Sequence, residues 1–263
     1  MHEKSGLTLV EILTVIAIIA LLTGILIPAV TAVKNAAKDV KQAGQLSTIE
    51  LALTAFKNDY GDYPPSAWNS GSIYAGGQKL TEALLGWDLL GFHPGSAWNW
   101  EGKDAAGTLV YNNSPANLSE RKGPYLESGT QYAFTLNDLF GSALFTRNGA
   151  NTYVLCDVFG RTKVAVSGGT AKAGAPILYY KADPSGKTIN TIYDDEDNIT
   201  IIQVKELVDG VTTPFDENAF YDCIRDPKIK AAVWPYNPSS YILISAGADG
   251  VYGTGDDIRN FGN

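Results

Sequence analysis

The stretch GLTLVEILTVIAIIALLTGILIPAV (residues 6–30) decides the architecture of this chain. All 22 residues from 12 to 33 are uncharged, and at about 1.5 Å per residue in a helix they match the roughly 30 Å hydrocarbon core of a bilayer. One carboxylate, Glu11, stands at the start of this run, where an ionised side chain in lipid costs several kcal/mol unless a partner neutralises it. The stretch therefore predicts a membrane-spanning helix whose acid has a specific role.

Two simpler interpretations of the segment compete with this one. A cleaved secretory signal has a shorter apolar region, an A-x-A-like end and no internal acid, and none of these features is present. A plain membrane anchor leaves Glu11 unexplained. The polar leader before the span, residues 1–6, carries one lysine, which favours a cytoplasmic N-terminus, and it ends at Gly6.

These residues resemble the class III signal of type IV pilins and type II secretion pseudopilins. In that family a prepilin peptidase cleaves after a glycine and methylates the new amine, and a glutamate stands fifth in the mature chain. The resemblance implies cleavage between Gly6 and Leu7, methylation of Leu7 and an assembly role for Glu11. Pro28 falls at the twenty-second mature position, where the family has a helix-loosening proline, whereas Leu7 replaces the more common phenylalanine.

The resemblance suggests what neutralises Glu11. In a filament core, the Leu7 ammonium of a neighbouring subunit can offset the carboxylate, and a monomer in the membrane lacks that partner. A buried charge of this kind favours assembly and sets the axial register, as a buried polar residue does in a coiled coil. We therefore expect the chain to form a helical homo-oligomer.

Beyond the span the helix becomes amphipathic. Apolar residues recur at three- and four-residue spacings, which predicts that one face packs on a core. These residues are Val40, Ala43, Leu46, Ile49, Leu53, Phe56 and Tyr60. We expect the helix to run from about Leu7 to about Asn58, with a kink near Pro28 and an end at Gly61 and the following prolines.

Segments rich in β-branched and aromatic residues predict strands in the second half of the chain. They are residues 152–159, 162–166, 176–181, 198–204 and 241–246. Short links favour antiparallel pairing. We also expect short helices at about 80–90 and within 215–232, and a solvated loop at the acidic run 194–197.

The fold class predicted from this pattern is α+β and pilin-like, with a long N-terminal helix packed on a small antiparallel sheet. The chain divides into five expected regions: a leader (1–6), a membrane and filament-core helix (7–33), its amphipathic half (34–60), a Trp- and Gly-rich connecting insertion (61–122), and a β-sheet region with a C-terminal loop (123–263).

The C-terminal stretch SAGADGVYGTGDDI (residues 245–258) combines carboxylates with glycines. Calcium takes six to eight oxygens, and glycine-permitted bends bring side chains and carbonyls to one point. The stretch resembles the calcium loop of major pseudopilins, which implies Asp249, Asp256 and Asp257 as side-chain ligands of a structural Ca²⁺. The alternative is a Gly-rich hairpin whose aspartates form Asx turns.

Two cysteines, Cys156 and Cys223, have no metal-binding spacing, and either a disulfide or two separately buried thiols fits the sequence. Four tryptophans, at 68, 87, 98 and 100, are expected to cover the helix and sheet, although exposed ones could anchor a partner.

Composition argues against several function classes. A net charge of −8 argues against nucleic-acid binding, which needs clustered lysines and arginines that this sequence lacks. The two histidines are His2, in the leader, and His93, and no phosphate-binding or dinucleotide motif is present, so we expect no enzyme.

The resemblance to pseudopilins therefore implies a structural subunit of a type II secretion pseudopilus that drives protein export. Its expected partners are the prepilin peptidase, other pseudopilins and the inner-membrane assembly platform. We expect a single pass through the inner membrane with the globular part in the periplasm. The alternatives are a type IV pilus subunit for adhesion or motility, a minor tip pseudopilin, and a membrane-anchored recognition module that uses the Trp-rich insertion.

Overall fold

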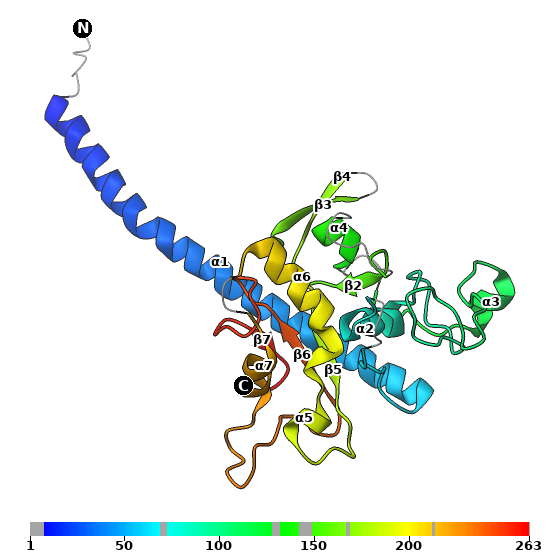
Figure 1. Cartoon of the computed structure of the whole chain (residues 1–263). Helices are drawn as coiled ribbons and strands as arrows, with labels where there is room; N and C mark the ends of the chain where they lie inside the picture. The colour runs from blue at the N-terminus through cyan, green and yellow to red at the C-terminus, as the bar shows by residue number, and fades with distance from the viewer. Residues whose placement is uncertain are drawn as a thin grey trace. The chain divides into compact units, whose positions relative to one another are not determined.

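A computed structural model of the chain describes residues 8–68, 73–127, 132–141, 149–166, 169–211 and 214–262, apart from the side chains of residues 28 and 31. The chain forms two compact units, Met1–Val40 and Lys41–Asn263. The first helix, α1 (Leu9–Tyr60), begins in the first unit and ends in the second (Figure 1). We refer to residues 41–263 as the globular unit.

Helices and short strands alternate along the globular unit. Its further helices are α2 (Gly76–Leu85), α3 (Pro115–Glu120), α4 (Leu136–Phe140), α5 (Ile189–Ile192), the 3₁₀ helix η1 (Asp195–Asn198), α6 (Ile199–Asp209) and α7 (Glu217–Ile224). Its strands are β1 (Ala133–Thr135), β2 (Tyr153–Leu155), β3 (Thr162–Val166), β4 (Gly169–Ala173), β5 (Leu178–Lys181), β6 (Tyr241–Ser245) and β7 (Ile258–Arg259).

In the part of the chain that the structure describes, all the strand pairs are antiparallel. They form the sheets β1–β2, β3–β4 and β5–β6–β7. In the largest sheet, Leu178 of β5 lies opposite Ile244 of β6, and β6 is fully buried. The chain is thus α+β, with a 52-residue N-terminal helix and small antiparallel sheets. This confirms the predicted pilin-like fold class.

The C-terminal half of α1 packs on the globular unit through one face. Leu46, Ile49, Leu53 and Phe56 are at most 2% exposed and belong to a core cluster that also contains Tyr179 and Leu243 of the sheet, among others. The predicted stripe begins later than expected, because Val40 is 74% exposed and Ala43 is also on the surface. The helix also ends two residues beyond the predicted end.

Helix α2 lies at the centre of the globular unit. All ten of its residues are buried, and it contacts both β2 and β5. Its N-terminus approaches the sheet so closely that a Cβ on Gly76 would lie 2.2 Å from the carbonyl oxygen of Tyr179. The insertion predicted as a connection at 61–122 thus contributes a core helix, which starts four residues before the predicted one.

The strand predicted at 198–204 is wrong, because these residues form the start of α6. Ile201 and Ile202 enter the core that also holds Phe220 and Ile244. The helix ends at Gly210, whose φ of 66° gives the left-handed conformation common after a helix. Tertiary packing here outweighs the β-propensity of the isoleucines.

The acidic run 194–197 is also not the solvated loop that we expected. Asp194 caps the 3₁₀ helix η1, and the other three residues of the run lie in that helix. Asp197 is only 3% exposed. Ser66 donates a hydrogen bond to one oxygen of the Asp197 carboxylate, and the Trp68 amide donates to the other at 3.2 Å. The run therefore anchors the chain that leaves α1.

Candidate functional site

The N-terminal part of α1 exposes an apolar surface on all sides. In the residues that the structure describes from 9 to 33, each leucine, isoleucine and valine is between 42% and 79% exposed. An 18-residue window in this helix has a mean hydropathy of 2.7, and none of it is buried. The helix is thus long and apolar enough to cross a membrane, although a signal sequence would meet the same criteria.

Glu11 has a local role that the sequence prediction missed. The amide and the hydroxyl of Thr8 each donate a hydrogen bond of 2.8 Å to Glu11 Oε2, and the Glu11 amide donates to Thr8 Oγ1 at 3.3 Å. This reciprocal arrangement is a capping box at the start of α1. Its signal, Thr-x-x-Glu before an apolar run, is present in the sequence.

The other residues predicted for processing and assembly are only partly visible. Gly6 and Leu7 lie outside the described residues. The side chain of Pro28 also lies outside them, while the backbone of α1 remains helical through position 28. The predicted cleavage, methylation and kink therefore stay predictions.

The C-terminal loop between β6 and β7 is built from hydrogen bonds to aspartates. Asp256 accepts from the amide of Asp249 at 2.7 Å and from the hydroxyl of Thr254 at 2.5 Å. Asp249 accepts from the Val251 amide at 2.7 Å, and Asp257 accepts from the Gly253 amide at 2.8 Å. These contacts have the character of the Asx turns considered as the alternative to a metal site.

One oxygen in the loop lacks a partner. Asp257 Oδ1 is buried and accepts no hydrogen bond. Burial, together with the charges of Asp256 and Asp249, raises the pKa of Asp257 to about 7. In Asp256, burial is outweighed by the hydrogen bonds from Thr254 and Asp249, which lower its pKa. A cation beside Asp257 would fit this environment.

The loop does not present a ready side-chain site, however. Within the described ranges, no three His, Cys, Asp or Glu side chains are placed so that they could hold a metal ion. Two main-chain oxygens of the loop already accept from cations, since Arg161 donates to the carbonyl of Gly247 and Lys205 donates to that of Gly250. The calcium prediction therefore depends on the orphaned oxygen of Asp257 and remains to be tested.

The cysteines are free thiols, so the candidate disulfide is not formed in this structure. Cys156, directly after β2, is fully buried in the core. Cys223, at the end of α7, accepts a contact of 3.3 Å from the guanidinium of Arg259. Each sulfur thus has its own environment, with Cys156 buried and Cys223 half-buried, and the pairing of the two cysteines stays a prediction.

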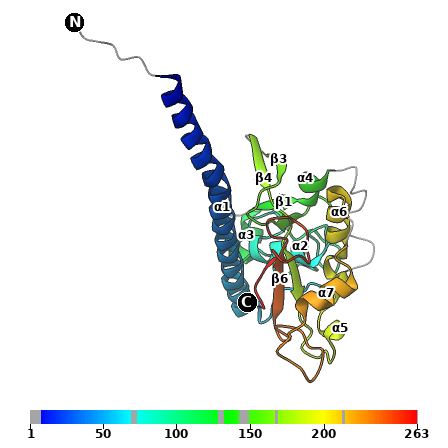
Figure 2. The same cartoon turned by 90° about the vertical axis from the view of Figure 1, so that its left-hand side faces the viewer.

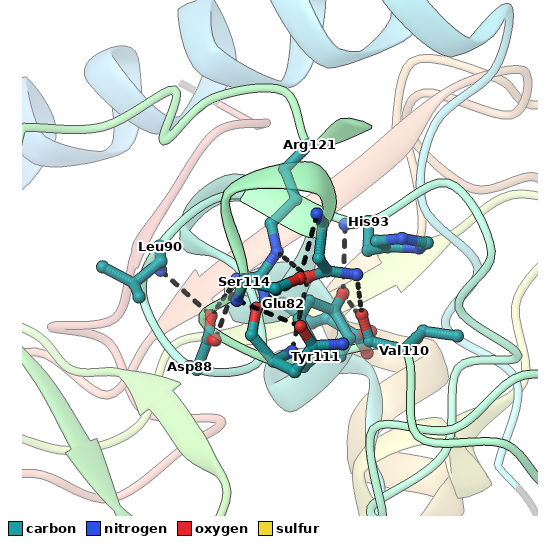
Figure 3. A network of polar contacts seen from close by, with 10 residues as sticks. Glu82, Asp88, Leu90, His93, Val110, Tyr111, Ser114 and Arg121 are labelled. Atoms are coloured by element: carbon teal, nitrogen blue, oxygen red, sulfur yellow. Dashed lines mark hydrogen bonds and ion pairs between the residues drawn. The ribbon is translucent and has the colours of Figure 1, made fainter. Parts of the chain in front are cut away.

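A buried polar network surrounds Glu82 of α2 (Figure 3). This carboxylate is 2% exposed and accepts hydrogen bonds from Tyr74, from Ser96 at 2.5 Å and from Tyr111 at 2.8 Å. Burial raises its pKa. The three donors come from segments on both sides of α2, so the network ties the insertion to the core helix.

The same insertion is held by an ion pair and contains His93. The Arg121 guanidinium donates to both oxygens of Asp88, at 2.7 and 2.8 Å, and lies 4.9 Å from the centroid of the Tyr111 ring (Figure 3). His93 is 7% exposed, its Nδ1 accepts from the Gly95 amide at 3.0 Å, and its Nε2 lies 3.4 Å from Glu120. With both nitrogens occupied, His93 has a structural environment. The expectation that the chain is not an enzyme remains a prediction.

Sequence reasoning missed these buried charges because α2 carries polar residues on a helix that is buried on every side. A periodic pattern predicts one buried face, and Lys79 and Glu82 would have been assigned to solvent by such a pattern. No family model, curated protein or solved structure matches the chain. The functional argument therefore depends on the residues themselves.

Proposed function

We propose that this chain is a structural subunit of a type II secretion pseudopilus that is anchored by α1 and assembles through it. The observation that carries the proposal is the start of α1, where an acid lies at the head of 22 uncharged residues whose described aliphatic side chains are exposed. An isolated soluble domain gains nothing from such a surface. Lipid, and then the helices of neighbouring subunits, would cover it.

The capping box separates two possible roles of Glu11, a local hydrogen-bonding role and a role of its charge in assembly. The bonds to Thr8 satisfy Glu11 locally, but both come from neutral groups, and among the residues that the structure describes no cationic side chain pairs with the carboxylate. In the proposed filament, the Leu7 amine of an adjacent subunit supplies the opposite charge. Cleavage after Gly6 by a prepilin peptidase would create that amine, with methylation following.

Two further parts of the proposal concern location and calcium. The globular unit would lie in the periplasm after one pass through the inner membrane, in contact with other pseudopilins and the assembly platform. Where a structural Ca²⁺ binds, Asp257 would hold it through its unpartnered oxygen, with Asp249 and Asp256 completing the acidic set. The ion would neutralise the carboxylates and fix the loop.

A type IV pilus subunit for adhesion or motility, or a minor tip pseudopilin, would use the same helix and is the alternative. The recognition-module alternative has less support, because Trp98 stacks on Phe92 with centroids 4.8 Å apart and Trp87 stacks on Tyr111 at 6.0 Å. These rings cover core and insertion residues.

A pair of substitutions at Glu11 tests the proposal. Glu11→Gln keeps an oxygen that can complete the capping box but removes the charge, whereas Glu11→Ala removes both. If the charge drives assembly, both variants insert into the membrane, lose the leader and fail to form filaments seen by electron microscopy.

The control is Thr8→Ala, which removes the local cap and leaves the charge. We expect it to assemble, with helix stability lowered by about 1 kcal/mol. Filaments from Glu11→Gln at the wild-type level would show that Glu11 serves only as a cap. That result would refute the proposed assembly mechanism.

A further inference from the structure

The hairpin formed by β3 and β4 carries an unusual pair of charges. Lys163 and Lys172 lie directly opposite each other across the two strands, and both are exposed. Like charges in this position destabilise a strand pair. Among the residues that the structure describes, neither amine has a hydrogen bond or an ion pair, so the repulsion has no internal compensation.

The hairpin is also poorly supported by the rest of the unit. Its only buried side chains are Val164 and Ala173, and each strand has one unpaired edge, since the sheet contains two strands. Val166 near its tip is 41% exposed. Figure 2 shows β3 and β4 projecting from the globular unit. Its other face, with Lys163, Ala165, Thr170 and Lys172, is therefore open to a partner.

The complementary surface lies elsewhere on the same unit. Five exposed carboxylates lie in η1 and α7 or at their N-caps, and the two helices contact each other and are joined by the bond from the Tyr221 hydroxyl to Asp195 at 3.1 Å. We call this set the acidic face; its members are Asp194, Glu196, Asp216, Glu217 and Asp222. In the described part of the chain none of the five forms an ion pair, and neither does Arg225, which follows α7.

Geometry prevents the two surfaces from meeting within one molecule. Helix α6 begins directly after η1, and its 11 residues span about 16 Å. Both Figure 1 and Figure 2 place the β3–β4 hairpin at one end of the globular unit and α7 toward the other. A contact between the lysines and the acidic face must therefore join two copies.

We infer that the β3–β4 hairpin of one copy docks on the acidic face of the next through Lys163 and Lys172. Because the two surfaces differ and lie apart, the contact is head-to-tail, and repetition of such a contact generates an open helical array. The inference deepens the proposed filament and rests on it for its setting. It names a contact between globular units that is separate from the packing of the N-terminal helices.

Zero-length carbodiimide cross-linking of the full chain in membranes tests this contact, because it joins an amine only to a carboxylate in direct contact. Equal amounts of ¹⁴N- and ¹⁵N-labelled chain distinguish bonds between copies. Mass spectrometry should find Lys163 or Lys172 joined to a residue of the acidic face, in peptides of mixed label. The absence of such peptides overturns the inference.

Charge reversal provides the matched variants. Lys163→Glu/Lys172→Glu removes both amines and reverses the charge of the hairpin, so the mixed-label cross-links at this contact should be lost. Glu217→Lys/Asp222→Lys alters the opposite side of the contact. Copies carrying only the lysine reversal should associate at least about tenfold less, as read by the retention of labelled chain on an immobilised copy. Mixing them with Glu217→Lys/Asp222→Lys copies should restore association. The control Lys187→Glu/Lys230→Glu changes net charge equally at other exposed lysines and should associate as wild type does.

The outcomes separate this inference from the proposed function. Filaments that depend on Glu11 but show no Lys163 or Lys172 cross-link would leave the filament proposal standing and overturn this contact. Cross-links without filaments would retain the contact and refute the pseudopilus. Equal loss of association in the control variant would show a general charge effect and would also overturn the contact.

Discussion

At the scale of single residues, the buried carboxylate of Asp197 links folding to pH. Burial raises its pKa to about 6, although the bonds from Ser66 and Trp68 favour the ionised form. The folded state therefore holds the proton more tightly than the unfolded chain, whose aspartates titrate near 3.9. The contribution of Asp197 to the free energy of unfolding is therefore highest below about pH 4 and decreases as the pH rises to about 6.

Replacement of Asp197 by asparagine should remove this dependence. The difference between the wild-type and Asp197→Asn unfolding free energies should change by about 3 kcal/mol between pH 4 and pH 7, with the variant losing less stability. Thermal unfolding followed by tryptophan fluorescence measures it, because all five tryptophans lie beyond residue 60. Glu196→Gln, at an exposed position in the same turn, is the control. A pH-independent difference would contradict the assignment.

At the scale of elements, the close approach of α2 to β5 predicts an asymmetry between two glycines. Gly76→Ala places a Cβ 2.2 Å from the backbone oxygen of Tyr179, which cannot move without displacing the strand. We expect a loss of about 1–3 kcal/mol or more in unfolding free energy. Gly44 of α1 has nothing within 4 Å of a Cβ, so Gly44→Ala should instead stabilise by about 0.5–1 kcal/mol.

The unfolding midpoints of the two glycine variants, measured side by side in the full chain, check this prediction. Because both substitutions are the same chemical change in a helix, propensity alone predicts two gains. A gain in Gly76→Ala would mean that α2 does not lie against β5 at this distance.

Elements whose signal is local could be predicted from the sequence. The apolar run of α1, the β-branched segments of β3 and β6, and the helix within 215–232 needed no knowledge of distant residues. The failures required tertiary information. The 198–204 segment is helical because Ile201 and Ile202 meet a core formed by distant residues, and Asp197 is buried because Ser66 and Trp68 reach it from far along the chain.

The candidate site shows the same division. The roles of Glu11, Pro28 and the aspartates of the C-terminal loop were implied by the family resemblance and stay predictions, whereas the Thr8–Glu11 box could have been identified from its spacing alone. The partners of Glu82 could not, since Tyr74, Ser96 and Tyr111 meet it only after the insertion folds over α2. The unpaired lysines of the β3–β4 hairpin depend on strand register, which the sequence does not specify.

At the scale of the whole molecule, charge is distributed unevenly between the two units. Residues 1–40 carry three acids and three bases, so the net charge of −8 belongs entirely to the globular unit. An acidic unit attracts divalent cations to its surface in general, and a specific site must be distinguished from this background. The distinction requires a variant that alters one carboxylate and a control that alters another.

Calcium should stabilise the globular unit through Asp257. At 1,000 times the dissociation constant, a specific site adds about 4 kcal/mol, which for a unit of this size raises Tm by about 8–16 °C. Tryptophan-detected unfolding of the full chain in detergent, with calcium and then with chelator, measures the shift. Asp257→Asn should abolish it because the buried oxygen set loses its charge, whereas Asp222→Asn on exposed α7 should retain it. Equal shifts with magnesium, or a shift that survives in Asp257→Asn, would indicate general screening, and the loop would then be a hairpin held by its Asx turns, Arg161 and Lys205.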